Sequence, residues 1–213
     1  VADLDKEYIR RMEDVLKLYE KPLSAEEPVV CVDEKPVLLH QDIRAPLAAG
    51  PGRIARRDYE YKRRGTANVF CGVEPKAGRH FPKPTATRSA AEFADYLVEI
   101  VARYPQAQTI HLVLDNLNTR RRKSLVKRYG EKLGGLLWER FTIHYTPKHG
   151  SWLNQAEIEV SLLSRQCLGQ RRIPNLDALC SEVHAWGRRL NRDCTTIDWN
   201  FTRRKARRKL HYS

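Results

Sequence analysis

Three acidic residues stand at positions from which they could bind metal ions together. Asp33 follows the apolar run 29–32, Asp115 follows the run 109–114, and Glu157 lies one turn into an expected helix. Ligands collect at the carboxyl ends of strands in open α/β sheets, so the two aspartates are well placed to meet. Hard oxygen ligands suit Mg²⁺ or Mn²⁺. Two such ions can hold the attacking and leaving oxygens of an in-line phosphoryl displacement.

Each acid also has a structural explanation. An aspartate at the end of a strand is commonly a turn or cap residue. Glu157 lies in a first helical turn, where the helix dipole favours an acid, and Glu159 competes with it for the third position. Spacing alone leaves these alternatives open.

Charge points to a polyanionic partner. The 213 residues carry 39 Lys and Arg against 26 Asp and Glu, a formal charge of +13. The segment 1–34 holds five basic and ten acidic side chains, so it carries −5 and the rest of the chain carries +18. Nucleic acid is the commonest partner for such a surface, whereas a solvated basic surface without a partner is the alternative. Five scattered cysteines without a C-x-x-C pair argue against a disulfide framework and a cysteine zinc site.

Hydrophobic periodicity predicts the elements that position the three acids. The order is strand, hairpin, helix, strand, helix, strand and helices, which indicates a mixed α/β sheet with helices on its faces. Residues 40–65 are expected to form an irregular, exposed excursion. The expected elements are a helix over 4–20, a buried strand ending at Asp33, a hairpin of Thr66–Val73 and His80–Thr87, a helix over 90–103 capped by Ser89, a strand ending at Asp115, a basic helix over 120–138, a strand Phe141–Thr146, a helix beginning near Gln155 and a helix over 176–191 capped by Asn175.

The blocks that contain the three acids resemble those of a known family. Val32-Asp33-Glu34-Lys35, Leu112-Val-Leu-Asp115-Asn116 and Ser151-Trp-Leu-Asn154-Gln-Ala-Glu157 resemble the catalytic blocks of DDE transposases, in the bacterial insertion-sequence branch related to the Tc/mariner elements. The resemblance covers roughly residues 5–210. Arg120 departs from the family's pattern, which often has histidine there, and the gap from Asp115 to Glu157 is longer than is typical.

The resemblance implies a ribonuclease H-like fold with a mixed five-stranded sheet flanked by helices. It assigns Asp33, Asp115 and Glu157, in preference to Glu159, as catalytic metal ligands for Mg²⁺, with Mn²⁺ as a substitute. Their carboxylates are expected to lie close enough to share a metal site. The implied activity is cleavage of transposon-end DNA followed by strand transfer into target DNA, by a homodimer in the bacterial cytoplasm at the nucleoid.

Basic, polar and aromatic residues are predicted to contact DNA. Phosphate contacts would give affinity that depends on salt and not on sequence. Trp152 could stack on a displaced base, although it is as readily explained as an anchor for its loop. The predicted DNA-binding residues are Lys35, Arg56, Arg57, Arg63, Arg64, Asn116, Arg120, Arg121, Arg122, Lys123, Lys148, Trp152 and Asn154. A third basic cluster lies at Arg203–Lys209.

Family members begin with helix-turn-helix modules, and none fits in the acidic segment 1–34. We therefore expect residues 1–27 to be a helix and linker from a missing DNA-binding module, and residues 28–213 to be the catalytic domain with a basic C-terminal segment. Two alternatives remain. One is a repair or recombination nuclease of the same fold, without strand transfer. The other is a catalytically dead nucleic-acid-binding remnant, with basic patches but no working metal site.

Overall fold

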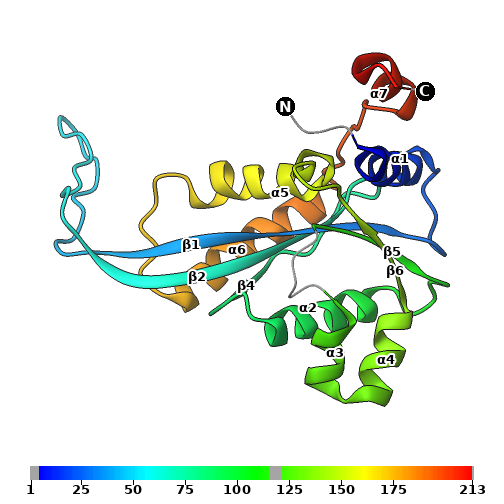
Figure 1. Cartoon of the computed structure of the whole chain (residues 1–213). Helices are drawn as coiled ribbons and strands as arrows, with labels where there is room; N and C mark the ends of the chain where they lie inside the picture. The colour runs from blue at the N-terminus through cyan, green and yellow to red at the C-terminus, as the bar shows by residue number, and fades with distance from the viewer. Residues whose placement is uncertain (1–4, 116–120, 213) are drawn as a thin grey trace.

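The computed structural model describes residues 5–115 and 121–212, which form one mixed sheet with helices on both faces (Figure 1). Five strands follow the order β3-β2-β1-β5-β6, and the short strand β4 pairs with β2 beside this path. Strands β1, β5 and β6 are parallel to one another, and β2 is antiparallel to β1. The strands are β1 (Val29–Asp42), β2 (Tyr61–Glu74), β3 (Arg79–His80), β4 (Lys83–Thr85), β5 (Ile110–Leu114) and β6 (Phe141–Tyr145). The predicted mixed sheet is confirmed, with β4 as a sixth strand.

Strand β1 is longer than the sequence pattern predicts, so Asp33 lies inside it and not at its end. The sequence pattern placed the end of the strand at Asp33, where the apolar run gives way to charged residues. β1 nevertheless pairs with β2 through Pro36 and beyond, while β5 accompanies it only over Val29–Cys31. At Pro36 the edge of β1 that faces β5 is no longer paired, so the missing N–H of the proline costs no hydrogen bond between strands there.

The long pair β1–β2 extends well beyond the rest of the sheet and carries residues 43–60 at its tip (Figure 1). The predicted irregular excursion is therefore shorter than expected, because both strands continue into it. The predicted hairpin with His80–Thr87 is present as β3 and β4, which pair with β2 at Val73↔His80 and Asn68↔Thr85.

The helices begin and end close to the predicted positions. Ser89 and Asn175 cap α2 and α6 as expected, accepting hydrogen bonds from the N–H groups of Glu92 and Ala178. The basic helix breaks into two at Gly130, whose φ of 82° an L side chain rarely adopts. The helices are α1 (Lys6–Glu20), α2 (Ala90–Arg103), α3 (Arg122–Tyr129), α4 (Glu131–Glu139), α5 (Ala156–Leu162), α6 (Leu176–Arg192) and α7 (Arg203–Leu210). A 3-10 turn (Ser151–Leu153) precedes α5, and a π-helical turn (Leu163–Leu168) follows it.

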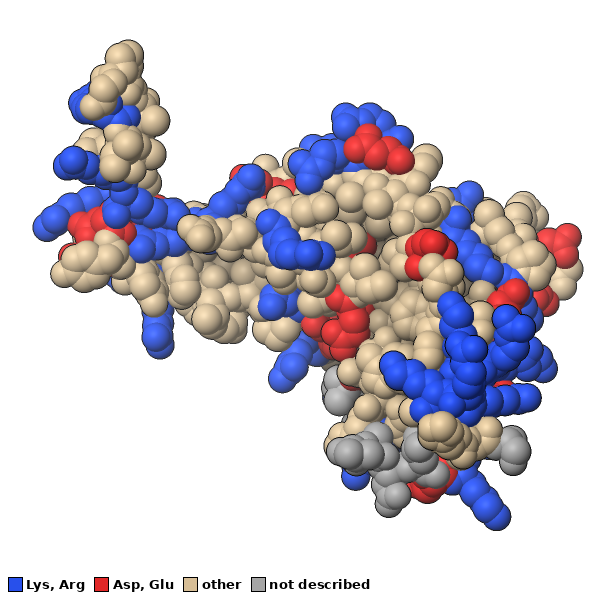
Figure 2. All heavy atoms as spheres, turned by 90° about the horizontal axis from the view of Figure 1, so that it is seen from above, with Lys and Arg blue, Asp and Glu red and all other residues tan. Residues whose placement is uncertain are grey.

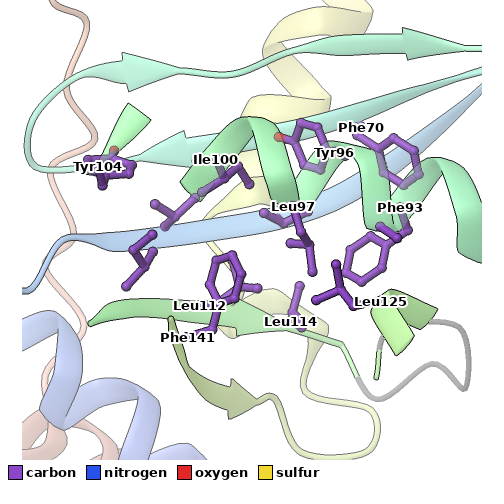
Figure 3. Packing of buried hydrophobic residues seen from close by; sticks show 14 of the residues in the cluster. Phe70, Phe93, Tyr96, Leu97, Ile100, Tyr104, Leu112, Leu114, Leu125 and Phe141 are labelled. Carbon is purple, nitrogen blue, oxygen red and sulfur yellow. The ribbon is translucent and has the colours of Figure 1, made fainter. Parts of the chain in front are cut away.

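The two faces of the sheet have separate cores. On one face, α2 and α3 cover even-numbered β1 residues such as Val32, and Figure 3 shows Phe70, Phe93, Leu97 and Leu125 packed together there. On the other face, α1, α5 and α6 cover odd-numbered residues such as Cys31, Val37 and Cys71. Alternation along a strand thus assigns Asp33, two residues after Cys31, to the face that α1 and α5 cover. No helix of the described residues is long and apolar enough to cross a membrane.

Candidate active site

Asp33 and Asp115 occupy matching positions on neighbouring strands. The last register pair between the parallel strands β1 and β5 is Cys31↔Val113, and each aspartate lies two residues further along its chain. Because side chains alternate with a period of two, the aspartates follow Cys31 and Val113 on the same face. Cys31 and Val113 both belong to the core beneath α1, together with Leu153. The register supports the prediction that the two acids meet, which stays a prediction.

Both aspartates are half-buried. Asp33 Oδ1 accepts a hydrogen bond of 2.8 Å from the backbone N–H of Glu34, and Asp115 Oδ1 is buried. The next residue on the same face of β1 is Lys35, also half-buried. These acids lie where α1 and the start of α5 meet the sheet, so the elements on this face determine what can approach them.

Asn154 attaches the beginning of α5 to the strand that carries Asp33. Its side-chain Nδ2 donates to the carbonyl oxygen of Val32 at 2.9 Å, and its Oδ1 accepts from the N–H of Ala156 at 3.2 Å. Asn154 is 1% exposed. Both polar atoms of its buried amide bond within the protein, which gives Asn154 a structural role, while its contact with DNA stays a prediction. Its role is to hold the first turn of α5, and hence Glu157, beside β1.

Glu157 is exposed on the first turn of α5, and its N–H donates to the carbonyl oxygen of Asn154 at 3.0 Å. It lines an open depression of about 500 Å³ together with Trp152, Ser161 and Arg165. Among the described residues, no three His, Cys, Asp or Glu side chains form a group that could hold a metal ion. The expectation that three carboxylates lie together is thus not met in this conformation, in which Glu157 is exposed and the aspartates are half-buried.

Glu159, the competing acid, is fully buried. Both of its carboxylate oxygens lie 2.9–3.0 Å from Nδ1 of His80 on β3. This ion pair has no exposed surface, so Glu159 is unable to reach a ligand that enters from solvent. The geometry therefore favours Glu157 as the acid that remains accessible.

The electrostatic environment of Cys71 shows which charges surround the sheet here. Cys71 on β2 stands opposite Asp33 in the register. Burial raises the pKa of its thiol well above the usual value, and the negative charges of Glu159 and Asp33 raise it further, while Lys35 opposes them. Two carboxylates and one ammonium group thus act on one buried position.

The donor chemistry of the site fits a divalent cation. Asp33, Asp115 and Glu157 offer only carboxylate oxygens, which are the ligands that Mg²⁺ and Mn²⁺ prefer. Two of the donors stand side by side at the end of the β1–β5 pairing, and the third lies on the neighbouring helix. Completing the set requires the Glu157 carboxylate to turn toward the aspartates.

Some arginines at the β1–β2 tip form hydrogen bonds within the protein, and others are exposed. Arg57 forms two hydrogen bonds of 2.8–2.9 Å with Asp42 at the base of the tip, and its role in binding DNA stays a prediction. Arg64 donates to Gln41 at 2.6 Å. Arg56 and Arg63 are exposed and form no ion pair with a described residue.

A second basic group lies at the start of α3. Arg121 precedes the helix, Arg122 pairs with Glu131, and Lys123 is exposed. Asn116 and Arg120, also predicted to contact DNA, lie outside the described residues. Figure 2, which looks onto the face that carries α1 and α7, shows Lys and Arg side chains gathered on the β1–β2 tip and, at the opposite end of the molecule, around α7.

Trp152 and Lys148 lie at the surface near Glu157. Trp152 is 43% exposed, packs edge-on against Phe201 with ring centres 5.3 Å apart, and directs Nε1 to the hydroxyl of Tyr8 at 3.4 Å. Lys148 is exposed in the turn before the 3-10 helix. Both explanations of Trp152 thus have support, since part of the ring anchors the loop and part remains accessible.

Sequence reasoning missed the contacts that join the chain's two ends. Arg207 on α7 forms two hydrogen bonds of 2.8–2.9 Å with Glu13 on α1, and Arg203 donates to Glu20 at 2.9 Å. These bonds lower the pKa values of Glu13 and Glu20. The acidic segment 1–34 and the basic cluster Arg203–Lys209 have opposite charges, and this could have indicated from the sequence that the two ends pair. Helix α1 is also part of the core, since Met12, Val15 and Leu16 are fully buried.

Comparison with known proteins identifies the family. Residues 28–180 match the family model of the DDE superfamily endonucleases. No curated protein matches the sequence. Among solved structures, the chain is similar to the pre-cleavage Mos1 transpososome (13% identity, TM-score 0.56, 93% of this chain and 66% of that chain). It is also similar to the Mos1 mariner paired end complex with Mn (15% identity, TM-score 0.54, 91% and 63%).

The chain therefore spans about 63% of the length of the Mos1 chain in the paired end complex. At this level of identity the similarity establishes the fold, which is the ribonuclease H-like fold of the Mos1 transposase, as the resemblance implied. The family match covers most of the chain and includes Asp33, Asp115 and Glu157. The family match and the shared fold agree with the matching positions of Asp33 and Asp115 on β1 and β5. The protein belongs to the DDE superfamily endonucleases.

Proposed function

We propose that this chain is the catalytic domain of a DNA transposase from the bacterial insertion-sequence branch related to the Tc/mariner elements. It cleaves a phosphodiester bond at the transposon end and joins the freed 3′-hydroxyl to target DNA. The observation that carries the proposal is the β1–β5 register, with Asp33 and Asp115 at matching positions on one face. Residues 28–213 form the proposed catalytic domain, and α1 packs on it.

Asp33, Asp115 and Glu157 are the proposed ligands of Mg²⁺, for which Mn²⁺ substitutes. Bound there, the metal would activate the attacking oxygen and stabilise the leaving oxygen. The Mos1 complexes with Mn and with Mg support a divalent ion in this fold. The hydrogen bond from Asn154 to Val32 joins the start of α5 to β1, which supports a place for Glu157 beside the aspartates.

DNA phosphates are the proposed partners of the exposed cations. Arg56 and Arg63 at the β1–β2 tip and Lys123 at the start of α3 are accessible in this conformation. They would position the duplex without reading its sequence. Trp152, beside Glu157 in the same depression, offers an accessible ring face for an unpaired base. We propose a homodimer acting on double-stranded DNA in the bacterial cytoplasm.

A cleavage assay tests the proposal. The full chain is incubated with supercoiled plasmid and with duplexes carrying a pre-cut 3′-hydroxyl end, in Mg²⁺, Mn²⁺ or EDTA. A transposase nicks the plasmid and joins the pre-cut end to it, in both cases only with metal. Nicking without joining supports the repair or recombination nuclease of the same fold. DNA binding without either reaction supports the catalytically dead remnant and overturns the proposal.

A further inference from the structure

A buried ion pair joins α5 to β3. His80 directs Nδ1 at both carboxylate oxygens of Glu159, at distances of 2.9 and 3.0 Å, and both side chains are completely buried. Its Nε2 lies 2.9 Å from the carbonyl oxygen of Thr195. A carbonyl oxygen only accepts hydrogen bonds, so Nε2 must donate, and Nδ1 donates to the carboxylate. The hydrogen bond and charge of Glu159 raise the pKa of His80, which favours the imidazolium–carboxylate form of the pair with charge-assisted hydrogen bonds.

The backbone of His80 is itself fixed to α6. Its N–H donates to Asn191 Oδ1 at 2.8 Å, and Asn191 Nδ2 donates back to the carbonyl oxygen of His80 at 2.8 Å. Asn191 Nδ2 also donates to the carbonyl oxygen of Gly187, within α6, at 3.0 Å. Glu159 is thus attached through His80 to a strand and to a seventeen-residue helix.

Helix α5 depends on such contacts for its orientation. The π-helical turn Leu163–Leu168 continues it directly, and the combined helical run is still of a length that is marginally stable in isolation. Polar contacts to other elements include Asn154 to Val32 and Tyr19 to Leu153 just before its first residue, and Glu159 to His80 in its middle. Glu157 lies between them. An α-helix turns about 100° per residue, so fixing the direction of Glu159 also fixes the direction in which Glu157 leaves the helix axis.

We propose that His80 and Glu159 are positioning residues for Glu157, because they fix the rotation of α5 about its axis. Neither side chain reaches solvent, so neither contacts DNA or a metal ion. An apolar contact would tolerate sliding and rotation, whereas a charged pair with both carboxylate oxygens engaged specifies one orientation. This inference deepens the proposed function, since Glu157 is its third metal ligand.

Hydrogen–deuterium exchange of the full chain tests the positioning role without relying on activity. The variants are Glu159→Gln and His80→Gln, and the matched control is His184→Gln, an exposed histidine on α6. We expect backbone amides of residues 155–163 to exchange about tenfold faster in both variants, while α2 and β5 keep their wild-type rates. Unchanged exchange over 155–163, or an equal increase throughout the chain, would overturn the inference.

A metal titration of cleavage distinguishes this inference from the proposed function. Loss of orientation should raise the Mg²⁺ concentration for half-maximal cleavage by about tenfold in Glu159→Gln, with unchanged DNA affinity. A merely structural role would lower the amount of active protein and leave that concentration unchanged. If the wild type does not cleave, the proposed function fails, and the exchange experiment still decides the positioning role.

A double variant covers the case in which a single variant does not fold. Removing one partner leaves an uncompensated buried charge, whereas replacing both by apolar residues is often tolerated. His80→Leu with Glu159→Leu should therefore fold and still show faster exchange over 155–163. Wild-type exchange in the folded double variant would show that packing alone orients α5, and would overturn the inference.

Discussion

Asp33 and Asp115 stand at matching positions of two parallel strands, each two residues beyond the register pair Cys31↔Val113. The two strands pair over only three positions, Val29–Cys31 with His111–Val113. The pairing of a few residues between β1 and β5 therefore sets the relative position of two acids that lie far apart in the sequence.

The first prediction concerns these acids. Asp33→Asn, Asp115→Asn and Glu157→Gln should each abolish Mg²⁺-dependent cleavage, because each substitution removes a metal ligand. Affinity for non-specific duplex should be unchanged or slightly higher, since a negative charge near the phosphates is lost. Plasmid nicking and gel-shift titration measure the two effects, and Glu139→Gln on α4 is a matched control. Undiminished nicking by all three variants would contradict the mechanism.

The second prediction concerns Asn154. Asn154→Ala removes the hydrogen bond to Val32 and leaves a buried carbonyl oxygen without that partner. We expect a loss of about 1–3 kcal/mol in the free energy of unfolding, measured by urea denaturation. The control is Asn200→Ala, whose Nδ2 bonds Asp198 at the surface and whose loss should cost less than about 0.5 kcal/mol. Equal effects of the two substitutions would show that Asn154 does not hold α5.

The third prediction concerns the pH dependence of stability. Burial alone would lower the pKa of His80, but the hydrogen bond and negative charge of Glu159 outweigh it and raise the pKa above its usual value. A group with a raised folded-state pKa stabilises the protein fully below its unfolded pKa of about 6.5, and this stabilisation is lost as pH rises through the raised value. Urea denaturation between pH 6 and pH 9 should show this decline in the wild type. The decline should be absent from His80→Gln, and a variant that kept it would contradict the assignment to His80.

The fourth prediction compares exposed and engaged arginines at the β1–β2 tip. With about six phosphates neutralised, log K for duplex DNA should fall with log salt at a slope of roughly −5. Arg63→Gln should reduce the magnitude of this slope by about 1, because Arg63 is exposed. Arg57→Gln should change it less, since Asp42 already pairs with Arg57. Fluorescence anisotropy at several salt concentrations measures both, and an equal change would show that Arg57 leaves Asp42 to bind DNA.

The fifth prediction concerns sequence specificity. The described residues contain exposed cations but no helix-turn-helix module that we could identify to read base edges. Binding should therefore be similar for transposon ends and for scrambled duplex, and should fall with salt equally for both. A hundredfold preference for the ends would reveal a recognition surface within these 213 residues.

Local patterns determined the elements and the identity of the acids. Apolar periodicity and capping residues are properties of neighbouring residues, which is why α2 with its cap Ser89 and α6 with its cap Asn175 lie where the sequence predicts them. The blocks around Asp33, Asp115 and Glu157 likewise indicated the family that the comparisons establish. The end of β1 was misplaced, because the tolerance of Pro36 depends on where the neighbouring strand β5 stops.

Only the tertiary structure decided what each polar side chain does. Asn154 and Glu159 look like ligand-binding residues in the sequence, yet each is buried against a partner from a distant part of the chain, Val32 and His80 respectively. Arg57 looks like its neighbour Arg56, but the fold gives it Asp42 as a partner. Burial and pairing depend on which distant segments meet, and that depends on the free energy of the whole packed arrangement. Sequence alone therefore indicated which residues have suitable chemistry, and the fold determined which of them remain accessible to use it.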